Sequence, residues 1–408
     1  MTGLSPSLAK KIIEKVNSGN PPIRGVEHYT VGLDYCLETI EKEYLQTFVK
    51  EGGATFKAVI GGYGMGKTHF LFSVQNLAWK NNYATSYVTL SPIETPFHDP
   101  ARVYMTIVNK LTYPPTNENE PTPGIDNFIR QWYIQKKNEI AHLEEDEQDR
   151  VLRDYADSIS GFENINFTRA VRNAFISLID DDDKKFEKVI GWIKGQEFDR
   201  RVHLTELGIY QKVDKSNAFS LIRSLSQLVS WIELSGLVIL FDETEHVPSY
   251  NTRQKELLLN NLRQLIDECG STFKNVMILY SFPDEQFLEG RYITYEALKQ
   301  RLASVFNFTN PSGVKIKLDE LTPEVDKFLL EMGLKLAHIY QVAYNVSFDT
   351  ARINLAIKSL VEAVEKRIHG PYKRLFAKGL ITVLNNMRIN PTLEVNLEYA
   401  EKVISEMT

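Results

Sequence analysis

Eight consecutive residues carry the clearest chemistry in the sequence. Residues 61–68 read Gly-Gly-Tyr-Gly-Met-Gly-Lys-Thr, the G-x-x-x-x-G-K-[ST] spacing of a phosphate-binding P-loop. Glycines let the backbone point its N–H groups at an anion, and the positive end of a following helix faces the same phosphates. At this spacing Lys67 would reach the β- and γ-phosphates of ATP, and the Thr68 hydroxyl would hold Mg²⁺. The candidate nucleotide-binding residues here are Gly62, Tyr63, Gly64, Met65, Gly66, Lys67, Thr68 and His69.

The second motif is acidic and follows an apolar run. Residues 237–241 read Leu-Val-Ile-Leu-Phe and end in Asp242 and Glu243, which is a Walker B arrangement. Asp242 would hold the Mg²⁺ that also contacts Thr68, and Glu243 would orient or deprotonate the attacking water. Ligands of open α/β sheets bind outside the carboxyl ends of the strands, which is where both carboxylates would lie. The pair of motifs predicts ATP hydrolysis, with Lys67 and Glu243 as catalytic residues.

Several single residues are weaker candidates for the same site. Ser281 follows the apolar run 276–280, where a polar side chain can contact the γ-phosphate, although an ordinary serine at a strand end fits as well. Arg291 and Arg301 come after that strand, and either is suited to act on the site of a neighbouring subunit. The helical context of Arg301 favours it over Arg291 as the catalytic arginine, while a surface arginine is the alternative.

The C-terminal part of the chain is rich in basic side chains. Between Lys366 and Arg388 the sequence holds several lysines and arginines. One of them, Arg374, is our candidate for a contact to the nucleotide from a helical lid. The others would contact the phosphates of double-stranded DNA, or form a solvated basic face.

The elements that must position these residues indicate an α/β fold. Residues 56–60, 84–90, 237–241 and 276–280 are expected strands, and the last two are apolar throughout, as in parallel strands buried on both faces. Helical patterns lie between them, including one over residues 69–79 directly after the P-loop, so a doubly wound sheet is expected. We expect a P-loop NTPase core over residues 1–320, a helical insertion at about 112–205 and a helical lid over 321–408. The four expected lid helices span residues 322–344, 350–368, 373–386 and 393–407.

Bulk composition limits the remaining possibilities. The 408 residues carry a formal charge of −6, which argues against coating nucleic acid by charge alone and leaves room for a local basic patch. The two cysteines, Cys36 and Cys269, have no metal-ligand spacing and are expected to be reduced, packed thiols. There is no apolar run of bilayer length and no secretory h-region, so we expect a cytoplasmic protein with no membrane contact.

Four segments resemble a known family. They are residues 21–32 (PPIRGVEHYTVG), 56–71 (FKAVIGGYGMGKTHFL), 207–218 (LGIYQKVDKSNA) and 236–245 (GLVILFDETE). Over roughly residues 8–310 the chain resembles AAA+ ATPases of the origin-recognition and STAND-like group, and more closely the ATP-binding protein of bacterial BREX phage-defence systems. The resemblance implies that Tyr29, Thr30 and Val31 line the adenine pocket. It also implies a role in defence against phage.

The combined expectation is an ATP-hydrolysing motor or switch in a defence complex. Its expected partners are further copies of itself or other defence-system proteins, and double-stranded DNA. Two alternatives stay open: a nucleotide-dependent scaffold with little turnover, and an ATP-dependent loader of a helicase or transposase.

Overall fold

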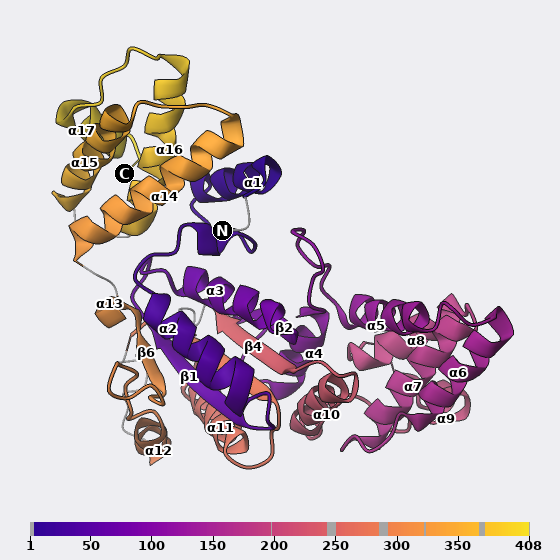
Figure 1. Ribbon diagram of the computed structural model, residues 1–408. Coiled ribbons are helices and arrows are strands. Elements are labelled where there is room, and N and C mark those ends of the chain that lie inside the picture. The colour runs from indigo at the N-terminus through magenta and orange to yellow at the C-terminus, as the bar shows by residue number, and fades with distance from the viewer. Residues whose placement is uncertain are drawn as a thin grey trace.

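The computed structural model describes residues 4–196, 198–242, 250–284, 293–321, 324–366 and 372–407. Within these ranges the chain forms a six-stranded sheet with helices on both faces, a group of helices beside one edge of the sheet, and a group of C-terminal helices above it (Figure 1). None of the described helices combines the length and apolar character of a bilayer-spanning segment.

The sheet is parallel except at one edge. The strand order is β3-β2-β4-β5-β1-β6, and only β3 runs antiparallel to its neighbour β2. The four strands expected from apolar runs are present close to their predicted bounds. The two-residue β3 has no sequence signal of its own, because two residues show no periodicity. The bounds are β1 Ala54–Ile60, β2 Tyr83–Thr89, β3 Leu111–Thr112, β4 Gly236–Asp242, β5 Val276–Phe282 and β6 Lys315–Lys317.

Alternating side chains of the buried strands hold helices against both faces of the sheet. On β4, Val238 and Leu240 share an apolar cluster with α2, η2 and α3, whereas Leu237, Ile239 and Phe241 share one with α4, α10 and α11. This period of two confirms the doubly wound α/β class. The helices of these layers are α2 Asp34–Thr39, its π-helical continuation η2 Ile40–Phe48, α3 Lys67–Lys80, α4 Pro100–Asn109, α10 Ala218–Trp231, α11 Thr252–Cys269 and α12 Ile293–Arg301.

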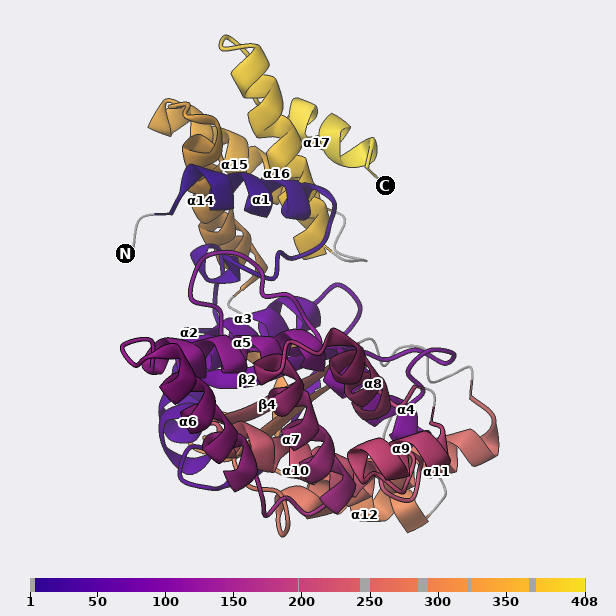
Figure 2. The same cartoon turned by 90° about the vertical axis from the view of Figure 1, so that its right-hand side faces the viewer.

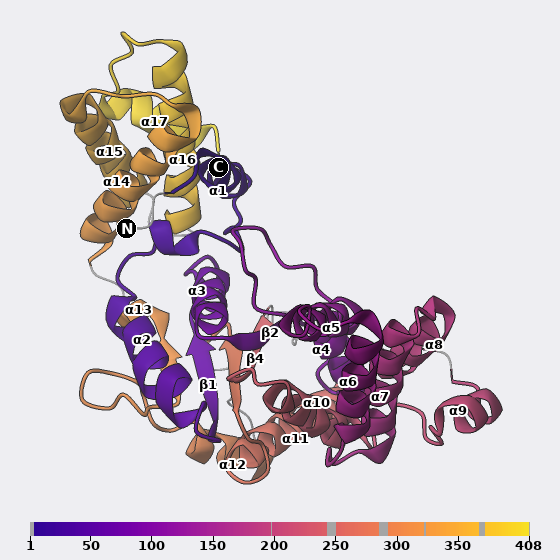
Figure 3. The same ribbon diagram turned by 45° about the vertical axis from the view of Figure 1, so that its right-hand side comes forward.

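Five helices occupy the segment expected to be an insertion. They gather beside the β2–β3 edge of the sheet, at the right of Figure 1 and of Figure 3. Their apolar core is continuous with the sheet core, since Trp132 of this group packs on Trp231 of α10, with ring centroids 5.9 Å apart. The helices are α5 Ile125–Glu139, α6 Glu145–Ser158, α7 Ile165–Ile179, α8 Asp183–Ile193 and α9 Arg200–Leu207.

The first helix of the chain packs with the last ones. All the buried apolar side chains of α1 (Pro6–Asn17) belong to the cluster formed by the C-terminal helices, and Figure 2 shows α1 lying across α14 and α16. This packing groups α1 with the C-terminal unit, whereas the sequence prediction places residues 1–320 in one core. The C-terminal helices are α14 Val325–Tyr344, α15 Thr350–Glu365, α16 Tyr372–Ile389 and α17 Leu397–Ser405; the short segments η1 Val26–His28 and α13 Leu318–Leu321 lie between the two units.

The two cysteines are buried and unbridged, as the sequence predicts. Burial raises the pKa of the Cys36 and Cys269 thiols to about 12. Neither thiol is therefore ionised near neutral pH, and both act as small apolar side chains.

We expect Ile12→Ala to loosen α1 from the C-terminal helices. Ile12 is 0% exposed, and its truncation leaves a cavity between α1 and its neighbours. The expected loss is about 2–5 kcal/mol in the local stability of this unit. Hydrogen exchange of α14 and α16 measures it, with the exposed Lys11→Ala as the control. Equal exchange in both variants would show that α1 contributes nothing to this core.

Candidate nucleotide-binding site

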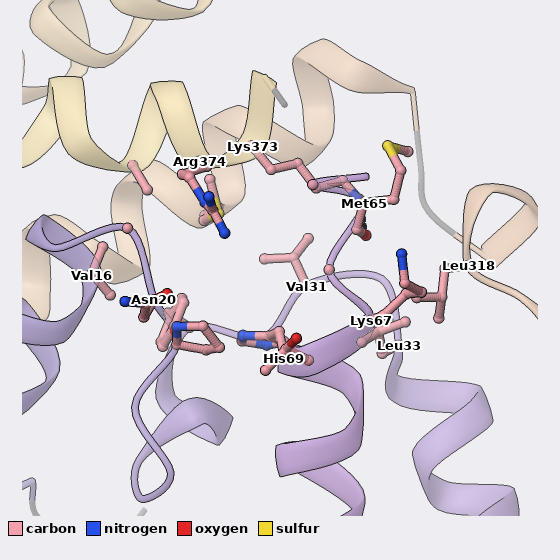
Figure 4. Close-up of a pocket in the computed structure, with 18 of the residues that line it drawn as sticks. Val16, Asn20, Val31, Leu33, Met65, Lys67, His69, Leu318, Lys373 and Arg374 are labelled. Atoms are coloured by element: carbon pink, nitrogen blue, oxygen red, sulfur yellow. Dashed lines mark hydrogen bonds between the residues drawn. The ribbon is translucent and has the colours of Figure 1, made fainter. Parts of the chain in front are cut away.

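A cavity of about 270 Å³ opens where three parts of the chain meet. The P-loop and the start of α3 form its floor, the segment after α1 forms one wall, and α14 and α16 cover it from above (Figure 4). Most of the lining is apolar, and the polar side chains gather at the P-loop and at the start of α16. The lining residues are Val16, Gly19, Asn20, Pro21, Tyr29, Val31, Leu33, Tyr63, Gly64, Met65, Gly66, Lys67, Thr68, His69, Asp242, Leu318, Phe328, Met332, Lys373, Arg374 and Ala377.

The backbone of the P-loop requires two of its glycines. Gly64 has φ of 75° and Gly66 has φ of 96°, a left-handed region in which a side chain is strained. The loop leads directly into α3, which begins at Lys67. The Lys67 ammonium donates to the carbonyls of Gly61 and Gly62, at 2.8 and 3.1 Å. The lysine is thus held by its own loop, beside the place where phosphates would compete for it.

Thr68 and Asp242 join the two sequence motifs. The Thr68 hydroxyl donates to Asp242 Oδ2 at 2.7 Å, although the residues are 174 positions apart in the sequence. Asp242 ends β4, is 1% exposed and still contributes to the cavity lining. A hydroxyl and a carboxylate fit Mg²⁺, which takes few protein ligands and completes its shell with water and substrate phosphates. Among the described residues, no cluster of three His, Cys, Asp or Glu side chains offers a different kind of metal site.

Ser281 contacts the carboxylate and not the cavity. Its side chain is 0% exposed, and its hydroxyl donates to Asp242 Oδ1 at 2.9 Å. The structure therefore gives Ser281 a different partner from the γ-phosphate that the sequence suggested. The reason is register, because β5 lies directly beside β4 and brings Ser281 level with Asp242.

Two of the three expected adenine-pocket residues, Tyr29 and Thr30, contact His69. Tyr29 packs edge-on against the His69 ring with centroids 4.9 Å apart, and Tyr29 and Val31 line the cavity. The Thr30 hydroxyl donates to the Val26 carbonyl at 2.8 Å, so its oxygen accepts from His69 Nε2 at 2.8 Å. Burial lowers the pKa of His69 to about 4, so the ring is neutral at pH 7 with its proton on Nε2. Thr30 thus holds the His69 ring and does not itself line the cavity.

Two cations reach the P-loop from the first turn of α16. The Arg374 guanidinium donates to the Tyr63 hydroxyl at 3.2 Å and lies over the Tyr63 ring. The Lys373 ammonium donates to the Met65 carbonyl at 3.2 Å and lies 4.5 Å from the Phe328 ring centroid. Burial lowers the pKa of Lys373 to about 8. Sequence reasoning proposed Arg374 for this place and missed Lys373, which it counted among the DNA-contacting residues.

The remaining candidates lie elsewhere. Glu243 and Arg291 fall outside the described residues. Arg301 does not line the cavity; its guanidinium pairs with Asp267 of α11, with Nη2 3.0 Å from Oδ2, and donates to the Ala297 carbonyl. In the part of the chain that the structure describes, the contacts of Arg301 thus lie outside the cavity lining of its own chain.

The described basic residues between Lys366 and Arg388 have different partners. Lys366 pairs with Glu401 at 2.7 Å, and the Arg388 guanidinium lies over the Tyr344 ring at 4.1 Å. Lys373 and Arg374 point toward the P-loop instead. A DNA contact from the basic residues of this stretch stays a prediction.

The chain matches one protein-family model over nearly all of its length. The model of the BREX system ATP-binding protein BrxC/D matches residues 4–403. The chain belongs to this family. The match confirms the resemblance seen in the sequence, and the family's description names ATP as the ligand. Comparisons with curated proteins and with solved structures gave no match.

The Lys373 pKa gives a testable pH dependence. Bound phosphates would favour the charged form of Lys373, so ATP binding near pH 8–9 should take up a proton, and ATP affinity should fall between pH 7.5 and 9.5. Calorimetry at several pH values measures this slope. Burial also lowers the pKa of Lys57 to about 8, although Lys57 does not line the cavity. A Lys373 variant is therefore needed to show that the pH dependence of ATP affinity comes from Lys373.

Lys373→Met should flatten the slope, and Lys378→Met, five residues further along α16 and outside the cavity lining, should keep it. An identical slope in wild type and Lys373→Met would remove Lys373 from the nucleotide site.

Proposed function

We propose that this protein binds and hydrolyses ATP as an AAA+ ATPase and acts as a motor or switch in a BREX defence complex. The observation that carries the proposal is the Thr68–Asp242 hydrogen bond inside a cavity that Lys67, Lys373 and Arg374 line with positive charge. A triphosphate with Mg²⁺ is the ligand that this combination fits. Membership of a family described as ATP-binding supports the same ligand.

The proposed chemistry assigns one task to each group. Lys67 donates to the carbonyls of Gly61 and Gly62 and would exchange them for the β- and γ-phosphates, and Thr68 and Asp242 would hold Mg²⁺. The bound ion would neutralise charge on the phosphate oxygens. Glu243, the next residue after Asp242, orients the attacking water and accepts its proton.

The proposed lid is the unit formed by α1 and α14–α17. The base of ATP would lie against Tyr29, Val31 and His69, which line the cavity, and the phosphates would attract Lys373 and Arg374 from α16. Binding and hydrolysis then change what these two cations contact. Because they belong to the C-terminal unit, the nucleotide state is coupled to the placement of that unit on the sheet.

The partners are proposed from the family and from charge. Membership of a BREX family favours other defence-system proteins. Arg301 favours self-association, because among the described residues it pairs with Asp267 and lies outside the cavity lining of its own chain. The net charge of −6 favours protein contacts over direct DNA binding, with double-stranded DNA bound by the assembled complex. The pairing of Arg301 with Asp267 also favours a second candidate: a scaffold that turns over slowly until a partner releases the arginine.

Two substitutions separate binding from hydrolysis. Lys67→Ala should abolish ATP binding, because it removes the cation of the P-loop. Glu243→Gln should keep ATP binding and lower turnover about a hundredfold or more, because it removes the water-orienting carboxylate and leaves Asp242 in place. Calorimetry and phosphate release measure the two effects, with Lys80→Ala at the exposed end of α3 as the control. Unchanged turnover in Glu243→Gln would exclude the role given to Glu243.

Arg301→Ala tests catalysis between subunits. An arginine finger contributes about a thousandfold to turnover, so the variant should lose turnover by about that factor while its ATP affinity stays the same. Breaking the half-exposed pair with Asp267 should cost little stability. The matched control is Arg263→Ala, an exposed arginine on α11. Turnover per subunit that depends neither on Arg301 nor on protein concentration would contradict catalysis between subunits.

A further inference from the structure

The Asp242 carboxylate accepts three hydroxyl hydrogen bonds. Ser281 donates to Oδ1 at 2.9 Å, while Thr68 and Tyr87 both donate to Oδ2 at 2.7 Å. Thr68 belongs to the P-loop motif and Ser281 follows an expected strand. Tyr87, on β2, belongs to no motif in the sequence.

The register of the sheet explains why these hydroxyls converge. In the β2–β4 pairing Thr89 lies opposite Asp242, so Tyr87, two residues earlier, points to the same face. In the β4–β5 pairing Phe241 lies opposite Tyr280, which brings Ser281 level with Asp242. The carboxylate is thus held from the strands on both of its sides.

Packing fixes the Tyr87 side chain as well. Its ring lies against Phe72 of α3 with centroids 4.7 Å apart, and α3 also carries Thr68. The Tyr87 hydroxyl is therefore aimed at Asp242 by contacts with the helix that follows the P-loop. A shift of α3 would therefore move both Thr68 and Tyr87, the two donors to Asp242 Oδ2.

We propose that Tyr87 is a positioning residue of the metal site, an inference that rests on the proposed function. With Ser281 on one oxygen and Tyr87 on the other, the plane of the Asp242 carboxylate is fixed before Mg²⁺ arrives. Thr68 is then the one hydroxyl of the three that Mg²⁺ shares with Asp242. Partners of this kind, which orient a metal-binding side chain without touching the metal, typically change metal affinity about tenfold to a hundredfold.

The test is the gain in ATP affinity that Mg²⁺ provides. ATP affinity is measured with Mg²⁺ and with excess EDTA, and the ratio of the two reports the metal site separately from the rest of the pocket. Tyr87→Phe keeps the ring contact with Phe72 and removes only the hydroxyl. We expect it to lower the ratio about tenfold and to leave the affinity in EDTA unchanged.

Tyr83→Phe is the matched control. Tyr83 lies on the same strand, is buried, and donates its hydroxyl to the Leu45 carbonyl at 2.6 Å. Tyr83→Phe therefore removes a comparable hydrogen bond that does not involve Asp242. Its ratio of ATP affinities with Mg²⁺ and with EDTA should match that of the wild type. Ser281→Ala, which removes the hydroxyl from Oδ1, should lower the ratio in the same sense as Tyr87→Phe.

The outcomes distinguish this inference from the function on which it rests. Absence of ATP binding by the wild-type protein would overturn the proposed function itself. Wild-type binding that Mg²⁺ strengthens, together with an unchanged ratio in Tyr87→Phe, would overturn only the role of Tyr87. Lower thermal midpoints in Tyr87→Phe and Ser281→Ala with wild-type ratios would mean that both hydroxyls serve folding alone, and this result also contradicts the proposal.

Discussion

The hydrogen bond from Thr68 to Asp242 is the contact on which the rest of the structure depends. It requires that β1, which leads into the P-loop, and β4, which ends in Asp242, lie in one parallel sheet with only β5 between them. It also requires α3 to start at the carboxyl edge of that sheet and to pack along one face of it. The other described elements cover the faces of this sheet, close the cavity above it, or, as α5–α9 do, pack beside its β2–β3 edge.

Segments from near the two ends of the chain line the same cavity. The segment after α1 and the first turn of α16 both line it, and α1 packs in the same apolar cluster as α16. Further contacts link this unit to the site: Lys335 of α14 donates to the Thr30 carbonyl at 2.7 Å, and Lys373 donates to the Met65 carbonyl. A ligand held between the P-loop and these helices would replace contacts on both sides, which is the physical basis for a nucleotide-dependent switch.

Part of the fold and of the candidate site could be predicted from the sequence, because it depends on local constraints. The P-loop glycines, with positive φ at Gly64 and Gly66, and the buried run ending in Asp242 each follow from short stretches of chain. Tyr87 and Lys373 were not predictable, because a tyrosine in a strand and a lysine at a helix start have many ordinary uses, and their partners come from distant segments. Ser281 was identified as a candidate but its partner was not, since the partner depends on strand register. The packing of α1 with the C-terminal helices has the same cause: an amphipathic pattern shows that a face is buried, and not against which helix.

The most direct test of a nucleotide held between the P-loop and the C-terminal helices is hydrogen exchange with and without ATP and Mg²⁺. We expect slower exchange in three separate segments: the P-loop and the start of α3, the segment 19–33, and the first turns of α16. The chosen segments come from three distant parts of the sequence that line one cavity. Protection confined to the P-loop, with no change in segment 19–33 or α16, would contradict a nucleotide held between the P-loop and the C-terminal helices. The absence of any change would contradict it as well.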